Sequence, residues 1–358
     1  MWEEKDWSNL PAELLHLISQ KLPKLSDYVR FRVVCKIWRF SAPLSDHPPQ
    51  LPGLIKHEAS YYPAGVIGHE MQFYSIFSGE TGILCKNLPS THRGKIFTGP
   101  SLGCLLLTDA YSNCVLFNPL TNKDMTSLPS LRSRPKIVWP WPVWTVTSPI
   151  PNRDIILVYR KINRNNAKGS WFFYDRDNGK WIASESGYNF YSFCYSGGKL
   201  FLIKGDYFTE VFDVSSRKIL SRIAPLRNEQ PPFRLPSRIY LVESAGEILR
   251  VSLDYETFVQ RKIVFSIHKL AKLDVRNGDC HVYSWVKVSS ISDQMLFLDY
   301  YDGFSMSCRP FAGHKGNCIY FFDSSFLPCS YNIEDGSVEQ VLPYSPLSLF
   351  TWFVPDLR

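Results

Sequence analysis

The sequence predicts a mainly β protein, in which a short N-terminal unit of three helices precedes a β-propeller of about six blades, alternatively seven. Three observations predict this fold. Aromatic residues make up 15% of the 358 residues, and aromatic side chains are enriched in strands. Turn dipeptides separate short apolar runs along most of the chain. A pattern of strand, Asn or Asp residue and turn also recurs.

The first 47 residues carry the helical pattern. Leu10-Pro11 begins a helix with proline near its first turn, where the missing N–H costs nothing, and Pro23 ends it. A second helix is predicted over Tyr28–Cys35, and Lys36–Arg39 continues into a third short helix. These helices carry more apolar side chains than so small a unit can bury. We therefore expect the unit to dock on the rest of the chain or to bind another protein.

Prolines indicate a linker over residues 48–65, between a helical domain at residues 1–47 and a strand-rich domain at residues 66–358. In the strand-rich domain, dipeptides that favour tight hairpin turns separate the predicted strands. They are Asn178-Gly179, Asn277-Gly278, Asp302-Gly303 and Asp335-Gly336.

A repeat is visible in the strand-rich domain. Three times a glycine precedes an apolar strand, and a second strand ends at Asn or Asp 15 or 16 residues later. The three copies run from Gly103 to Asn118, from Gly198 to Asp213 and from Gly316 to Asn332, and partial copies end at Asp175 and Asp274. Repeated hairpins at this spacing are typical of propeller blades, and a closed ring leaves few exposed strand edges.

The formal net charge of +7 comes from one segment. Between residues 132 and 168 there are eight basic residues and one acid, so the rest of the chain is neutral. Four interpretations stay open: an ordinary insert of the propeller, a docking surface for an acidic protein, a nuclear-import signal or a nucleic-acid site. The candidate target-docking residues are Arg132, Arg134, Lys136, Arg160, Lys161 and Arg164.

Cysteine and histidine spacing gives no metal or cofactor site. The nine cysteines form no C-x-x-C pair, and the histidines do not stand at zinc-ligand spacing beside them. The first residues lack the apolar stretch of a signal peptide, and no apolar run is as long as a membrane helix requires. We therefore expect no cofactor, no membrane partner and a location in the cytoplasm, the nucleus or both.

One motif resembles that of a hydrolase. Gly99 to Gly103 fits G-x-S-x-G, whose serine acts as a nucleophile on a turn between a strand and a helix. Here a predicted strand follows Ser101, and Pro100 restricts the turn. We therefore expect a hairpin loop and no catalytic residue at this position.

The N-terminal unit resembles an F-box. The run from Trp7 to Leu15 and the run from Arg30 to Arg39 match that motif in order, including Leu10-Pro11 and the Val-Cys-Lys-x-Trp ending at Trp38.

The rest of the chain resembles the β-propeller of the plant F-box proteins called the KIB type. The matching segments are Trp285–Val288, Met295–Asp299, Gly316–Phe321 and Trp352–Pro355. One departure lies at Ser290–Asp293, where the family usually has Ser-Leu-Gly-Asp. Loss of that glycine implies a different geometry in this turn.

The resemblance implies a non-catalytic subunit of a Skp-cullin-F-box (SCF) ubiquitin ligase. The F-box would bind a Skp-type adaptor, and through it a cullin, while the propeller would recruit an unknown protein target for ubiquitination and degradation. The residues expected to form the adaptor face and its support are Leu10, Pro11, Leu14, Leu15, Ile18, Leu25, Tyr28, Val29, Val33, Cys35 and Trp38. The alternatives are a propeller scaffold outside ubiquitination and an enzyme of the propeller type. The scattered acids show no set that would serve such an enzyme.

Overall fold

A computed structural model describes most of the chain. The described residues are 7, 10–22, 24–58, 65–66, 70–77, 83–101, 103–109, 113–129, 155–161, 168–175, 178–185, 190–226, 238–255, 262–273, 282–299, 302–342 and 348–356.

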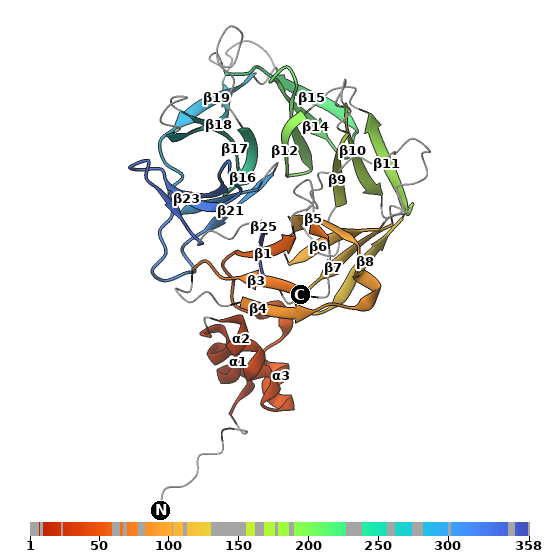
Figure 1. Ribbon diagram of the computed structural model, residues 1–358, viewed down its shortest axis with the longest axis vertical. Helices are drawn as coiled ribbons and strands as arrows, with labels where there is room; N and C mark the ends of the chain where they lie inside the picture. The colour runs from red at the N-terminus through yellow and green to blue at the C-terminus, as the bar shows by residue number, and fades with distance from the viewer. Residues whose placement is uncertain are drawn as a thin grey trace, which may run out of the picture.

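Three short helices form the N-terminal module, which lies at one end of the molecule (Figure 1). They are α1 (Ala12–Gln20), α2 (Leu25–Val33) and α3 (Lys36–Ser41), and a 3-10 turn, η2 (Leu44–Asp46), follows them. The second helix begins and ends earlier than the predicted Tyr28–Cys35. Cys35 adopts an extended backbone (φ −158°) at the N-cap of α3, so it separates two helices and belongs to neither.

The described strands form six sheets, which follow one another around a ring in Figure 1. The mainly β prediction and the propeller are confirmed. The first sheet holds β25 (Ser348–Phe353), β1 (Gly53–Glu58), β3 (Glu70–Tyr74) and β4 (Ile83–Asn87). The second holds β2 (Gly65–Val66), β5 (Ile96–Ser101), β6 (Cys104–Thr108), β7 (Cys114–Asn118) and β8 (Lys123–Leu128). The third holds β11 (Lys180–Glu185), β10 (Lys168–Asp175) and β9 (Ile155–Lys161).

The other three sheets complete the ring. The fourth holds β12 (Phe190–Ser196), β13 (Lys199–Lys204), β14 (Thr209–Asp213) and β15 (Lys218–Ile223). The fifth holds β16 (Arg238–Ser244), β17 (Glu247–Tyr255), β18 (Ile263–Leu273) and β19 (Val282–Val288). The sixth holds β21 (Gly303–Ser307), β20 (Gln294–Leu298), β22 (Cys318–Phe322), β23 (Pro328–Asn332) and β24 (Val338–Gln340). The apolar core lies between neighbouring sheets: one cluster joins Val251 of the fifth sheet to Leu296 and Phe321 of the sixth.

The two ends of the propeller pair with each other. Strand β25 runs antiparallel to β1, with Gly53 opposite Phe353 and Glu58 opposite Ser348. Residues 53–58 lie inside the predicted linker 48–65, so the linker prediction is wrong for this part. Proline density marked the approach to the sheet, whereas the partner of β1 lies almost 300 residues away and no local pattern could show it.

The repeat corresponds to one structural unit. The residue before the first strand of each copy has a left-handed backbone: φ is 74° at Gly103, 76° at Gly198 and 59° at Asn317. The Asx residue at the end of each second strand caps the turn that follows. Asn118 Oδ1 accepts from Leu120 N at 2.9 Å, and Asp213 Oδ1 accepts from Ser216 N at 2.8 Å.

Two of the four predicted turn dipeptides place their glycine in a left-handed turn. Gly179 and Gly336 have left-handed backbones, with φ of 60° and 70°, in the turns before β11 and β24. Asp302 directly precedes β21, which begins at Gly303, and Gly303 has little room for a side chain because an added Cβ would lie 2.7 Å from Leu298 Cδ2. Asn277-Gly278 lies outside the described residues.

Strand β5 ends at Ser101 and the next described element is strand β6, whereas a nucleophile turn leads into a helix. Among the helices of the described part of the chain, none has the length and apolar character to cross a membrane.

Candidate protein-docking site

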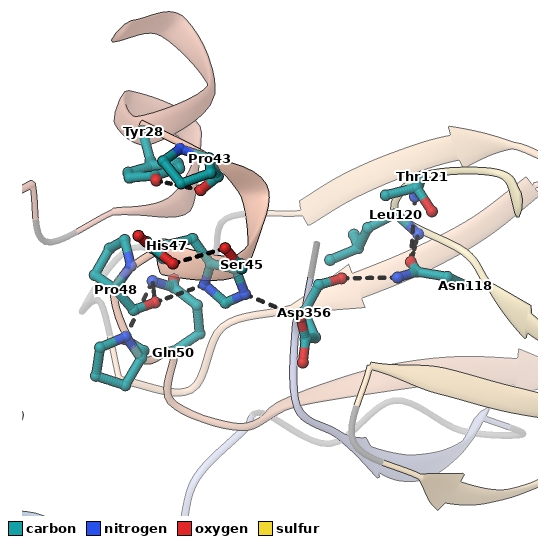
Figure 2. A network of polar contacts seen from close by, with 12 residues as sticks. Tyr28, Pro43, Ser45, His47, Pro48, Gln50, Asn118, Leu120, Thr121 and Asp356 are labelled. Carbon is teal, nitrogen blue, oxygen red and sulfur yellow. Dashed lines mark hydrogen bonds and ion pairs between the residues drawn. The ribbon is translucent and has the colours of Figure 1, made fainter. Parts of the chain in front are cut away.

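The N-terminal module has a small apolar core. Four side chains are buried in it, those of Leu15, Tyr28, Phe31 and Ala42, and Trp38 packs on them with its ring centroid 4.3 Å from that of Phe31. The Tyr28 hydroxyl donates to the Pro43 carbonyl oxygen at 2.6 Å (Figure 2). Burial raises the pKa of Tyr28, so this hydroxyl stays protonated and remains a donor.

A second set of apolar side chains on the module faces solvent. Of the sixteen exposed large hydrophobic residues in the described part of the chain, nine lie between residues 7 and 40. They are Trp7, Leu14, Leu17, Ile18, Val29, Val33, Val34, Ile37 and Phe40. We call this set the exposed apolar set. Leu14 and Ile18, and likewise Val29 and Val33, stand four residues apart on one helix, so each pair lies on one helix face.

The structure divides the predicted adaptor residues into two groups. Leu15 and Tyr28 are fully buried, and Leu10, Leu25 and Trp38 pack against the module core. These five support the helices and do not form an outer face. Cys35 is half-buried. The exposed residues are Pro11, Leu14, Ile18, Val29 and Val33.

Five members of the exposed apolar set were not among the predicted adaptor residues: Trp7, Leu17, Val34, Ile37 and Phe40. Phe40 is the most exposed of the large hydrophobic residues that the structure describes, at 81%. The motif alone did not indicate it, because the matched run ends at Arg39. Asking which apolar residues are too many for the small module core would have indicated these residues from the sequence.

Of the six predicted target-docking residues, two lie in the described part of the chain. Arg132, Arg134, Lys136 and Arg164 lie outside the described residues. Arg160 and Lys161 lie in β9, opposite Gly169 and Lys168 of β10.

Thiol and metal chemistry do not mark a site in the described part of the chain. No group of three or more His, Cys, Asp and Glu residues there could hold a metal ion. Burial raises the pKa of Cys104 and of Cys114 to about 12, so both thiols are protonated, and therefore poor nucleophiles, at neutral pH.

Comparison with known families identifies both parts of the chain. A model of the F-box domain matches residues 7–42. A model of the KIB1-4 beta-propeller matches residues 73–344, which is more than half of the chain. The chain belongs to the KIB1-4 β-propeller family. Its N-terminal module is an F-box, so the resemblance drawn from the sequence is confirmed for both parts.

Relatives of this KIB1-4 propeller protein include F-box proteins of Arabidopsis thaliana. At1g65770, named as an F-box protein, is 26% identical over 377 residues, which cover 98% of this chain and 99% of that protein. F-box protein SKIP23 is 40% identical over 75 residues, 20% of this chain and 18% of its own length. Among solved structures, the Cps50 (Swd1) β-propeller domain of Myceliophteria thermophila has a TM-score of 0.38 and 10% identity, and the match covers 80% of this chain and 88% of that one.

Proposed function

We propose that this F-box protein is the substrate-recognition subunit of an SCF ubiquitin ligase. In this proposal the F-box binds a Skp-type adaptor, which links it to a cullin, and the propeller recruits a protein target. The observation that carries the proposal is the concentration of exposed apolar side chains on the F-box helices. The subunit contributes no catalytic group and acts by bringing the target close to the conjugating enzyme.

The exposed apolar set supplies the proposed adaptor contacts. Burying such side chains stabilises a complex by roughly 25 cal/mol for each Å² of apolar surface, and each of the three helices contributes to the set. Leu15 and Tyr28 have a different role in the proposal: they hold the helices in position from within. Substitution of a core residue would therefore weaken adaptor binding through unfolding, whereas substitution of an exposed residue would weaken it directly.

The test is binding of the full chain to a purified Skp-type adaptor. Val33→Asp and Phe40→Asp each place a charge at a position that is exposed in the free protein, so both variants should fold. We expect each to weaken adaptor binding at least tenfold, which corresponds to about 1.4 kcal/mol. Calorimetric titration measures the affinity, and thermal unfolding confirms that each variant is folded.

A matched control comes from the propeller. Leu220 lies on β15 and is 52% exposed, so Leu220→Asp adds the same charge to the same kind of surface away from the F-box. This variant should bind the adaptor like the wild type. Normal binding by both F-box variants would contradict the proposed contacts. Failure of the intact protein to bind any Skp-type adaptor would contradict the receptor function and favour a scaffold outside ubiquitination.

Three finer points belong to the same proposal. We infer six blades, one for each sheet that the described strands form, and an experimental structure of the full chain would count them. Affinity capture with the proteasome inhibited would identify the target. Neutralising the basic residues at 132–168 in the same experiment tests whether this segment docks the target. Fluorescence microscopy of the tagged protein tests the predicted cytoplasmic or nuclear location.

A further inference from the structure

The C-terminal tail, Val354–Asp356, lies between the F-box and the propeller. Figure 2 shows Asp356 beside His47, at the point where the chain leaves the F-box helices. Asp356 Oδ1 lies 3.0 Å from His47 Nε2, and each side chain is only 7% exposed. The Asp356 backbone oxygen accepts from Asn118 Nδ2 at 2.9 Å. One residue of the tail therefore contacts both the propeller and the segment that directly follows the F-box helices.

The tail has little freedom to move on the propeller. Gly103 N donates to the Val354 carbonyl oxygen at 3.0 Å. A Cβ atom added at Gly103 would lie 2.2 Å from Asp356 Cβ, which is far inside van der Waals contact. The absence of a side chain at Gly103 thus lets the tail lie directly on the backbone of the second sheet.

The two ring nitrogens of His47, just after the F-box helices, face acceptor groups. Its Nδ1 lies 2.8 Å from the Pro48 carbonyl oxygen and its Nε2 faces the Asp356 carboxylate. Both of these partners are acceptors, so His47 makes both hydrogen bonds only when each ring nitrogen carries a proton. In that state the contact is a buried ion pair, and removal of either side chain disrupts it.

Leu120 provides an apolar contact beside this ion pair. It belongs to the turn between β7 and β8, yet it packs against the buried core of the F-box. Asn118 connects the two contacts, because its Oδ1 accepts from Leu120 N while its Nδ2 donates to Asp356. The polar and apolar contacts between the two parts therefore share one support on the propeller (Figure 2).

We propose that Val354–Asp356 is a strap that fixes the orientation of the F-box helices relative to the propeller. The strap continues directly from β25, and His47 precedes β1, the strand with which β25 pairs. One strand pair therefore closes the ring and holds the F-box. If the proposed receptor function is right, this orientation sets the distance between a target on the propeller and the adaptor.

The orientation can be measured on the full chain without any partner. We would attach two fluorophores through unnatural amino acids at the exposed positions Glu13, on α1, and Glu334, in a propeller turn, and record single-molecule energy transfer. The wild type should give one narrow distribution. Asp356→Ala, His47→Ala and Leu120→Ala should each broaden it. Glu339→Ala, an exposed substitution on β24, is the matched control and should leave the distribution narrow.

Hydrogen exchange of β1 and β25 distinguishes loss of the strap from unfolding of this strand pair. Broadened energy transfer with unchanged protection of these strands supports the strap. Asp356→Ala could also lower the hydrogen-exchange protection of β25. In that case the energy-transfer result for His47→Ala is the deciding measurement, because His47 lies outside both strands. Narrow distributions for His47→Ala and Leu120→Ala would overturn the proposal. Because these readouts need no adaptor, a failure of adaptor binding would contradict the receptor function and leave the strap standing.

Discussion

Ser292 adopts a left-handed backbone conformation, with φ of 57°, which costs an L-residue roughly 1–2 kcal/mol. It lies in the turn that leads into β20, where Ser292 N donates to Ser290 Oγ at 3.1 Å and Gln294 N donates to the Ile291 carbonyl oxygen at 3.1 Å. Serine here takes the left-handed conformation that glycine favours, and the expectation of a different turn geometry stays a prediction. The acceptors of these two hydrogen bonds are the Ser290 hydroxyl and the Ile291 carbonyl oxygen, and the Ser292 side chain takes no part in them.

The first prediction concerns this residue. Ser292→Gly should raise the free energy of unfolding by about 0.5–1 kcal/mol, because relief of the left-handed strain exceeds the entropic cost of glycine. Urea denaturation measures the change. Ser289→Gly, in the same loop but without a positive φ, is the control and should lower stability slightly. A stability loss in Ser292→Gly would show that the turn carries no strain.

At the scale of the element, the recurring unit is a strand, an Asx cap and a turn. Asp213 Oδ1 accepts from Ser216 N, and Asn332 Oδ1 accepts from Glu334 N at 2.9 Å in the equivalent turn of the sixth sheet. The backbone N–H of Ser216 holds the pKa of Asp213 below its usual range. The same cap is thus ionisable in one copy of the repeat and neutral in another.

A prediction about pH dependence follows from this difference. Because the pKa of Asp213 is lower in the folded than in the unfolded protein, its contribution to stability is present above the unfolded value of about 4 and is lost as the pH falls through the folded value. Asp213→Asn keeps an acceptor without the charge, so it should lose less stability than the wild type between pH 7 and pH 3. Urea unfolding at the two pH values measures this difference.

The reciprocal variant provides the control for this prediction. Asn332→Asp introduces an ionisable cap into the equivalent turn, so its stability should become more sensitive to acid than that of the wild type. Equal acid sensitivity of the wild type and both variants would contradict the role assigned to the cap.

At the scale of the whole molecule, the pairing of β25 with β1 closes the ring. Trp352 of β25 is fully buried, and its Nε1 donates to the Leu298 carbonyl oxygen of the sixth sheet at 3.0 Å. Thr351 Oγ1 donates to the buried Asp299 carboxylate at 2.6 Å. The closing strand is therefore held by its neighbours in the first sheet and by the adjacent sixth sheet.

Because β25 closes the ring, we expect the loss of its buried Trp352 side chain to lower the stability of the whole propeller. Trp352→Ala removes a buried aromatic side chain and should cost about 3–5 kcal/mol of the free energy of unfolding. Val338→Ala, on β24 and 41% exposed, is the control and should cost about 0.5 kcal/mol or less. Urea unfolding compares the two variants, and a loss below about 1 kcal/mol for Trp352→Ala would mean that β25 contributes little to the ring.

Much of the fold was predictable because it depends on nearby residues. Helix patterns, turn dipeptides and the Asx caps act over a few positions, so the F-box helices and the hairpin from β6 to β7 follow from sequence alone. Burial within the F-box was not predictable residue by residue. Leu14 and Leu15 are adjacent and equally apolar, but only Leu15 reaches the module core, since the outcome depends on how the three helices pack.

Local sequence patterns were enough to predict the order of the parts and their classes: an F-box, then a strand-rich domain of repeated hairpins. The pairing of β25 with β1 became visible in the folded chain alone, and it places part of the predicted linker in the propeller. Only the tertiary structure brought His47 and Asp356 together across 309 positions. The physical reason is that such contacts depend on the closed shape of the ring, which joins segments whose local patterns carry no information about each other.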